Sequence, residues 1–84
     1  MQAYRIDREE EAIAQVQTYL RAISYLHAEV PHVGIDGIYG EETKEAVRAF
    51  QALYGREPNG IVDAETFTLL YLTYLKVPRK FPIK

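Results

Sequence analysis

Two acidic clusters carry the residue types that could act as acid and base. Glu9, Glu10 and Glu11 form one cluster, and Glu41 and Glu42 form the other. A glycosidase needs two carboxyl groups that face each other across a sugar, whereas neighbouring residues of a helix point about 100° apart. Both clusters also lie in predicted first turns of helices, where glutamate is favourable at the positive end of the helix dipole. We therefore interpret them as helix starts and not as a catalytic pair.

The other reactive residue types are few. Ser24 is the only serine, and nothing in the sequence places it near a base. His27 and His32 are the only histidines, and they lack the cysteine partners or the helical pairing of a zinc site. The chain has no cysteine, no Gly-rich phosphate loop and no calcium-loop pattern at 36–40. We predict no catalytic residue, no metal and no cofactor, and we do not expect an enzyme.

Length and charge narrow the class of protein further. The 84 residues leave room for one domain, whose core must form without disulfides. Acidic and basic residues are interspersed and leave a formal net charge of −2, so we expect no nucleic-acid partner. No apolar run approaches the ~18 residues of a membrane span, so we expect no membrane partner. The first residues show no signal-peptide pattern, so we expect an intracellular chain or a piece of a longer protein.

A turn that leads into a helix occurs twice in the chain. Residues 36–43 read Asp-Gly-Ile-Tyr-Gly-Glu-Glu-Thr, and residues 59–66 read Asn-Gly-Ile-Val-Asp-Ala-Glu-Thr. The Asp-Gly and Asn-Gly pairs signal tight turns, because glycine accepts a positive φ and the Asp or Asn side chain bonds nearby backbone. We predict two equivalent turn-into-helix elbows whose isoleucines, Ile38 and Ile61, plug one core. The residues expected to hold the turns are Asp36, Gly37, Thr43, Asn59 and Gly60.

Helical periodicity predicts an all-α fold. We expect helices at about 8–26, 41–54 and 63–76, packed as a compact three-helix bundle. Gly55 is placed to end the second helix in a left-handed cap, and Asp63 is placed to cap the start of the third. The first helix carries its apolar stripe at Ile13, Val16, Leu20 and Ile23.

The predicted domain runs from residue 7 to 77, between a lead-in at 1–6 and a tail at 78–84. The third helix is apolar on most sides, so it is either buried on most sides or covers a partner. Leu72 and Leu75 point away from its core-facing residues, and we expect the tail, the chain start or a second copy to cover them.

The aromatic residues leave two interpretations open. The chain has seven tyrosines, three phenylalanines and no tryptophan. In the first interpretation, Tyr19, Tyr54 and Tyr74 lie at the edge of the core with their hydroxyls in water. In the second, some rings line a shallow groove, above all Tyr39 beside the first elbow. A ring in such a groove stacks on the apolar face of a sugar while its hydroxyl forms a hydrogen bond.

These motifs, taken in order, resemble a known family. Residues 16–25 read Val-Gln-Thr-Tyr-Leu-Arg-Ala-Ile-Ser-Tyr, residues 36–51 combine Asp-Gly, Tyr-Gly, Thr, Ala-Val and Phe-Gln, and residues 59–67 combine Asn-Gly-Ile-Val with Thr-Phe. Over roughly residues 13–75 they resemble the small three-helix peptidoglycan-binding domain. The chain departs from the family's common Gly, Gly and Trp at Ser24, Asp63 and Phe67.

The resemblance implies a non-catalytic module that docks on peptidoglycan, through the glycan or the stem peptide, and that usually sits beside a wall hydrolase. It implies a place in the cell wall, outside the cell or in the spore, as part of a larger or exported protein. We expect the ligand beside the first elbow, in contact with Tyr39, Glu42, Gln51 and Tyr54. The alternative is a protein-interaction domain of the same fold, which assembles with another protein or with its own copies through the third helix.

Overall fold

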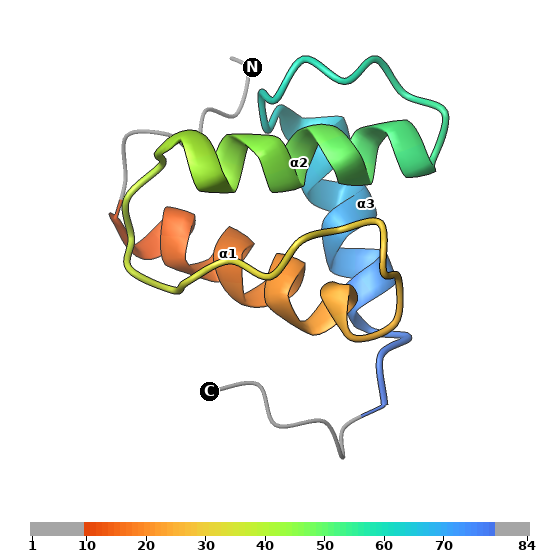
Figure 1. The fold of residues 1–84 in the computed structure, drawn as a ribbon, viewed down its shortest axis with the longest axis horizontal. Coiled ribbons are helices and arrows are strands. Elements are labelled where there is room, and N and C mark those ends of the chain that lie inside the picture. The colour runs from red at the N-terminus through yellow and green to blue at the C-terminus, as the bar shows by residue number, and fades with distance from the viewer. Residues whose placement is uncertain (1–9, 79–84) are drawn as a thin grey trace.

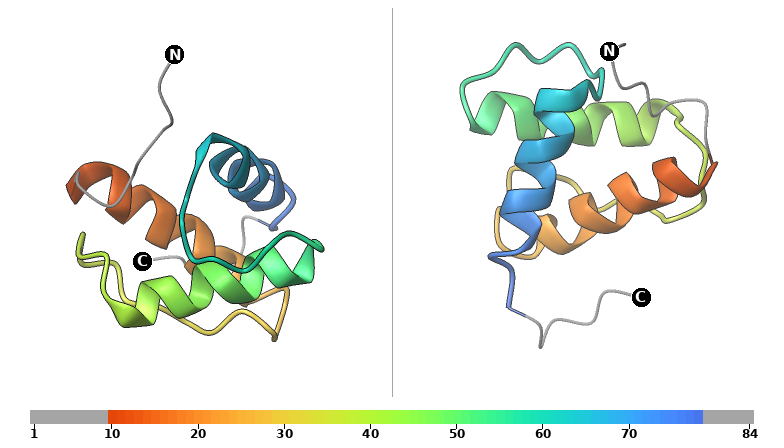
Figure 2. Two further views of the ribbon diagram at one scale, coloured as in Figure 1. Left: turned by 90° about the horizontal axis from the view of Figure 1, so that it is seen from above. Right: turned by 180° about the vertical axis from the view of Figure 1, so that it is seen from behind.

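Three helices make up the described part of the molecule. The computed structural model describes residues 10–78, with α1 at Glu10–Ser24, α2 at Glu41–Leu53 and α3 at Ala64–Tyr74. α1 and α2 lie side by side and run in the same general direction (Figure 1). α3 crosses them steeply and packs mainly against α1 (Figure 2). Residues 10–78 contain no strand, and the predicted all-α, three-helix fold is confirmed.

α1 carries the predicted apolar stripe on its buried face. Ile13 is 4% exposed, and Val16, Leu20 and Ile23 are fully buried. The helix ends at Ser24, two residues before the predicted end, and the chain then turns. The predicted helix start at residue 8 and the lead-in at 1–6 lie outside the described residues, as does the tail beyond residue 78.

The boundaries of α2 and α3 follow the local signals in the sequence. Beyond α2, Gly55 has φ 71° and the Arg56 N–H bonds the Gln51 carbonyl at 2.8 Å, which forms the expected left-handed cap. Before α3, the Asp63 carboxylate accepts a hydrogen bond from the Thr66 N–H at 2.9 Å, so the predicted cap is confirmed. α2 ends one residue and α3 two residues before the predicted positions.

The connector between α1 and α2 belongs to the core. Val30 and Val33 are 2% and 1% exposed, and Phe50 of α2 is fully buried. The connector returns along both helices, so it covers part of their shared face (Figure 1). The buried apolar residues of the core are Ile13, Val16, Tyr19, Leu20, Ala22, Ile23, Val30, Val33, Ala46, Val47, Phe50, Val62, Leu70 and Val77.

An aromatic cluster joins α1 to α3. The ring of Tyr19, which is 6% exposed, lies 4.7 Å from the ring of Tyr74. It also lies 5.9 Å from the ring of Phe67 and 6.0 Å from that of Tyr71, measured between centroids. Tilted pairs at these separations are favourable. Tyr19 and Tyr74 therefore serve the helix packing. The first interpretation expected Tyr19 at the core edge with its hydroxyl in water, but Tyr19 is buried and its hydroxyl accepts a hydrogen bond from the Gln15 amide at 2.8 Å.

α3 has one buried and one outward side. Leu70 is fully buried, whereas Leu72 and Leu75 are each 49% exposed and Tyr71 is 43% exposed. The predicted outward direction of Leu72 and Leu75 is therefore confirmed. The expected cover from the chain start or the tail falls on residues outside the described range.

The isoleucines of the elbows point outward, and the prediction that they plug the core is wrong. Ile38 is 64% exposed and Ile61 is 47% exposed. The next residue in each copy turns inward instead: Tyr39 packs against the core and Val62 is 3% exposed. Successive side chains of an extended segment point to opposite sides. The first residue after each turn glycine therefore faces solvent, and the second faces the core.

Candidate functional site

A buried glutamine from α1 closes the first elbow. Gln17 is 1% exposed, and its carbonyl oxygen accepts hydrogen bonds from the N–H groups of Asp36 at 3.0 Å and Gly37 at 2.9 Å. Its amide nitrogen lies 2.9 Å from Asp36 Oδ1, 3.0 Å from the Ile38 carbonyl and 2.9 Å from Thr43 Oγ1. One side chain thus satisfies polar groups on both sides of the turn.

A second glutamine, from α2, closes the second elbow in the same way. Gln51 is 3% exposed and accepts a hydrogen bond from the Gly60 N–H at 3.0 Å. Its amide nitrogen donates to Asn59 Oδ1 at 3.2 Å, to the Ile61 carbonyl at 3.0 Å and to Thr66 Oγ1 at 3.2 Å. We expected Gln51 to contact the ligand, but in the structure its side-chain amide forms hydrogen bonds with the residues of the turn.

The other residues of the two turns stabilise the conformation of the backbone. Gly37 has φ 76° and Gly60 has φ 75°, a region that favours glycine. Asp36 Oδ1 accepts from the Ile38 N–H at 3.0 Å, and Asn59 Oδ1 accepts from the Ile61 N–H at 2.9 Å. The Ile38 N–H, followed by the Gln17 amide, holds the pKa of Asp36 below its ordinary value.

The other residues of the predicted ligand set lie at opposite ends of α2. Tyr39 precedes the helix, and Glu42 lies exposed in its first turn. Tyr54 follows the helix and is 39% exposed; its ring lies 5.0 Å from that of Phe50, and its hydroxyl lies 3.3 Å from Thr73 Oγ1. The 13 residues of α2 span about 20 Å. Only Tyr39 and Glu42 therefore share the first elbow.

One hydrogen bond links the two elbows. The Tyr39 hydroxyl donates to the Gly60 carbonyl at 2.6 Å. Ile38 and Ile61, the two outward isoleucines, each adjoin one partner of this bond. We call Ile38, Tyr39 and Ile61 the elbow face. Sequence reasoning missed the two isoleucines as surface residues, although their equivalent places in the repeat were visible.

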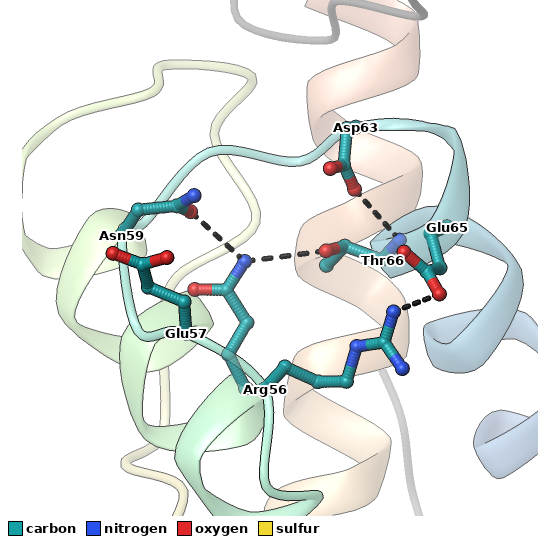
Figure 3. Close-up of a pocket in the computed structure, with 7 residues that line it drawn as sticks. Arg56, Glu57, Asn59, Asp63, Glu65 and Thr66 are labelled. Carbon is teal, nitrogen blue, oxygen red and sulfur yellow. Dashed lines mark hydrogen bonds and ion pairs between the residues drawn. The ribbon is translucent and has the colours of Figure 1, made fainter.

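A polar pocket of about 210 Å³ lies at the second elbow (Figure 3). An ion pair between Arg56 and Glu65 crosses one side of it. The Asp63 carboxylate lies nearby; the Thr66 N–H chiefly, and the Arg56 charge to a smaller extent, hold its pKa below the ordinary value. The pocket is lined by Gln51, Arg56, Glu57, Asn59, Asp63, Glu65 and Thr66.

Ser24 lies beside an imidazole, a neighbour that the sequence did not indicate. Its Oγ is 2.5 Å from His32 Nδ1 and also donates to the Arg21 carbonyl at 2.6 Å. Because the single hydroxyl proton is used by that carbonyl, the His32 Nδ1–H must be the donor in the other contact. The histidine is therefore not placed as a base for this hydroxyl.

Within residues 10–78, no three His, Cys, Asp or Glu side chains are grouped so that they could hold a metal ion. None of α1, α2 and α3 combines the length and apolar character needed to cross a bilayer.

Comparison with known proteins places this geometry in a family. Residues 9–70 match the family described as "Putative peptidoglycan binding domain". The chain belongs to this family. The matched part of this peptidoglycan binding domain includes both elbows, the two buried glutamines and the polar pocket. The resemblance drawn from the sequence motifs is thus confirmed.

Two curated relatives are amidases by name. The chain is 41% identical over 56 residues to "Probable N-acetylmuramoyl-L-alanine amidase" of Bacillus licheniformis, covering 66% of this chain and 16% of that protein. It is 41% identical over 46 residues to "N-acetylmuramoyl-L-alanine amidase CwlA" of Bacillus subtilis (strain 168), covering 54% of this chain and 17% of that protein. The chain therefore spans about a sixth of each relative. No solved structure matches it significantly.

Proposed function

We propose that this peptidoglycan binding domain docks on the bacterial wall through its elbow face, without catalysing a reaction, and holds an associated wall hydrolase at its substrate. The family supplies the binding role. The link to a hydrolase is supported by the two relatives, which are named as amidases and extend well beyond the matched segment. This function implies a place in the cell wall or outside the cell.

The observation that carries the proposed surface is the paired exposure of Ile38 and Ile61. A single exposed apolar side chain needs no explanation. Here the same position of both elbows turns an isoleucine outward, 64% and 47% exposed, and each isoleucine is next in sequence to one partner of the Tyr39–Gly60 hydrogen bond. Peptidoglycan offers matching apolar groups, namely sugar faces, acetyl methyls and alanine methyls. Covering the isoleucines with such groups removes apolar surface from water and favours binding.

Tyr39 and Glu42 supply the polar side of the proposed contact. The Tyr39 ring is partly buried and its hydroxyl is bonded to the second elbow, so the ring is held in a fixed position. Glu42 is exposed beside it on α2 and is available to accept hydrogen bonds from hydroxyl or amide groups. We leave Gln51 out of the contact because its amide is enclosed in the second elbow, and Tyr54 because it lies at the far end of α2.

Cosedimentation with purified peptidoglycan tests this function. The wild-type chain should enter the pellet and release no soluble sugar or peptide. Changing Ile38→Ser and Ile61→Ser together should weaken binding about tenfold, because two apolar contacts are lost. The matched control is Leu72→Ser on α3, which removes a similarly exposed side chain and should leave wall binding unchanged. Equal binding by the double variant and the wild type would reject the elbow face.

The outer side of α3 favours a second candidate function, assembly with other proteins. Tyr71, Leu72 and Leu75 expose 43%, 49% and 49% of their surface on one helix. If this surface carries the function, Leu72→Ser should reduce self-association or partner binding in analytical ultracentrifugation. Wild-type protein that stays in the supernatant with walls from several bacteria, yet self-associates through α3, would replace wall docking by assembly.

A further inference from the structure

The two elbows share the residues that form the turn but differ in most of the charged residues around the pocket. Residues 33–43 align with 56–66, and both copies keep the Asx, glycine and threonine of the turn. Each turn is closed by a buried glutamine. Three of the four charged residues that line the pocket lack charged counterparts: Arg56, Glu57 and Asp63 align with Val33, Gly34 and Gly40, whereas Glu65 aligns with Glu42.

The first elbow thus folds without these charges, and their effect at the second elbow is to form a charged pocket. Gln51 and Thr66, 3% and 5% exposed, form its buried side. At its open side, the Glu57 carboxylate has no hydrogen-bond or ion-pair partner within residues 10–78. The side-chain nitrogen of Asn59 has none in the same range, since only its Oδ1 is bonded. The pocket therefore retains polar groups that a ligand can satisfy.

The chemistry of the lining selects among ligands. All seven lining residues are polar or charged, so the pocket has no aromatic or aliphatic wall on which the apolar face of a sugar could lie. Three carboxylates, from Glu57, Asp63 and Glu65, outnumber the one guanidinium of Arg56. The ion pair holds Glu65 against Arg56, which leaves Glu57 and Asp63 as the carboxylates without a cationic partner in contact. The described carboxylates are not grouped as metal ligands, so a compact organic cation is the better fit.

We propose that this pocket receives the free ammonium group of the diamino acid in peptidoglycan stem peptides. Glu57 and Asp63 act as its counter-ions, and an ammonium group supplies three N–H donors for their oxygens. Arg56, with donors to spare beyond its bond to Glu65, lies where a neighbouring carboxylate of the same amino acid can meet it. This inference rests on the proposed wall docking and assigns the stem peptide to the second elbow.

Chemical acetylation of the wall tests the inference. Purified sacculi are used untreated or after reaction with acetic anhydride, which converts free amines to neutral amides. Wild-type binding should weaken about fivefold on acetylated sacculi, the size expected for loss of partly exposed ion pairs. Sacculi stripped of stem peptides by an amidase distinguish the peptide amine from any amine on the glycan, because acetylation should then have no effect on binding.

Variants of the pocket residues test the same contact from the side of the protein. The double variant Glu57→Gln, Asp63→Asn removes both charges, and asparagine still caps α3. It should bind untreated sacculi about fivefold more weakly than the wild type and should be insensitive to acetylation. Glu29→Gln makes the same chemical change at an exposed site of the connector and should behave as the wild type. Circular dichroism and thermal melting establish that both variants are folded.

The outcomes separate this inference from the function on which it rests. Equal wild-type binding to untreated and acetylated sacculi would overturn the ammonium site and leave wall docking intact. An acetylation effect that persists on stripped sacculi would overturn the assignment to the stem peptide. Failure to bind any of the sacculi would reject wall docking, and the ammonium site with it.

Discussion

The first elbow is closed by a glutamine that lies far away in the chain, whereas the second is closed by one that lies close by. Gln17 precedes the turn atoms it bonds by 19 to 26 residues, and Gln51 precedes its own by 8 to 15. The bonds of Gln17 thus fix α1 to the start of α2, while those of Gln51 fix the end of α2 to the start of α3. The same local geometry therefore has two roles, one in tertiary packing and one in a helix–helix connection.

The largest expected effect is the loss of the first glutamine. Gln17→Leu keeps most of the side-chain volume but leaves the buried N–H of Gly37 and its neighbours without partners. We expect it to lower the free energy of unfolding by about 3 kcal/mol, and Gln51→Leu by about 2 kcal/mol. Urea denaturation of each variant measures both values. Gln15→Leu, an exposed change on α1 that removes one hydrogen bond to the Tyr19 hydroxyl, is the control and should cost under about 1 kcal/mol. A larger loss for Gln51→Leu would contradict the different roles of the elbows.

The sequence could predict the elbows but not the side chains that close them. The repeat and the Asx-Gly pairs indicate two turns, and helical spacing indicates which faces of the helices are buried. A role for Gln17 depends on a contact that crosses the connector, and neither helical periodicity nor turn chemistry reports such a contact. The available signal was a polar residue next to the apolar stripe, since Gln17 follows Val16 and precedes Leu20 by three positions.

The candidate site was harder to predict than the fold for a related reason. The elbow isoleucines were expected inside because they are apolar, yet the alternation of an extended segment turns them outward. The pocket depends on Arg56, Glu57 and Asp63, which lie between two helices and follow no periodic pattern. Sequence patterns report buried faces well. They report poorly on surfaces that form only when loop residues meet in space.

Substitution of the turn glycines by alanine should destabilise the protein more at the second elbow than at the first. This order is the reverse of that expected for the glutamine variants. Both glycines have positive φ, which costs other residues about 1–2 kcal/mol. A Cβ at Gly37 would lie 3.3 Å from the Glu10 carbonyl oxygen, whereas one at Gly60 would lie 2.8 Å from Lys44 Cγ and 3.3 Å from Arg48 Nε. We expect Gly60→Ala to cost about 2 kcal/mol and Gly37→Ala about 1 kcal/mol.

Thermal and urea unfolding of the two alanine variants measure this difference. Gly34→Ala is the control, because a Cβ at Gly34 meets nothing within 4 Å and its φ is not positive. It should leave the unfolding midpoint nearly unchanged. If Gly37→Ala proves the more costly variant, packing against α1 matters more at the first elbow than the crowding by α2 side chains does at the second.

The smallest expected effect is a difference in acid sensitivity, because the first elbow has Asp36 where the second has Asn59. Hydrogen bonds from the Ile38 N–H and the Gln17 amide hold the pKa of Asp36 below its ordinary value in the fold. The folded state therefore binds this proton less readily than the unfolded state, whose aspartate has a pKa of about 3.9. The stabilisation by Asp36 is present above that pH and is lost as the pH falls through the lower, folded pKa.

Asp36→Asn should remove this dependence without breaking the turn, since Asn59 accepts the same backbone hydrogen bond at the second elbow. The variant should be slightly less stable than the wild type at pH 7, and the gap between them should narrow when urea denaturation is repeated at pH 3. Asp63, whose pKa is also lowered, still titrates in both proteins and so cancels in the comparison. A stability gap between wild type and variant that is the same at both pH values would show that the charge of Asp36 does not contribute. The two elbows would then be equivalent in energy as well as in geometry at this position.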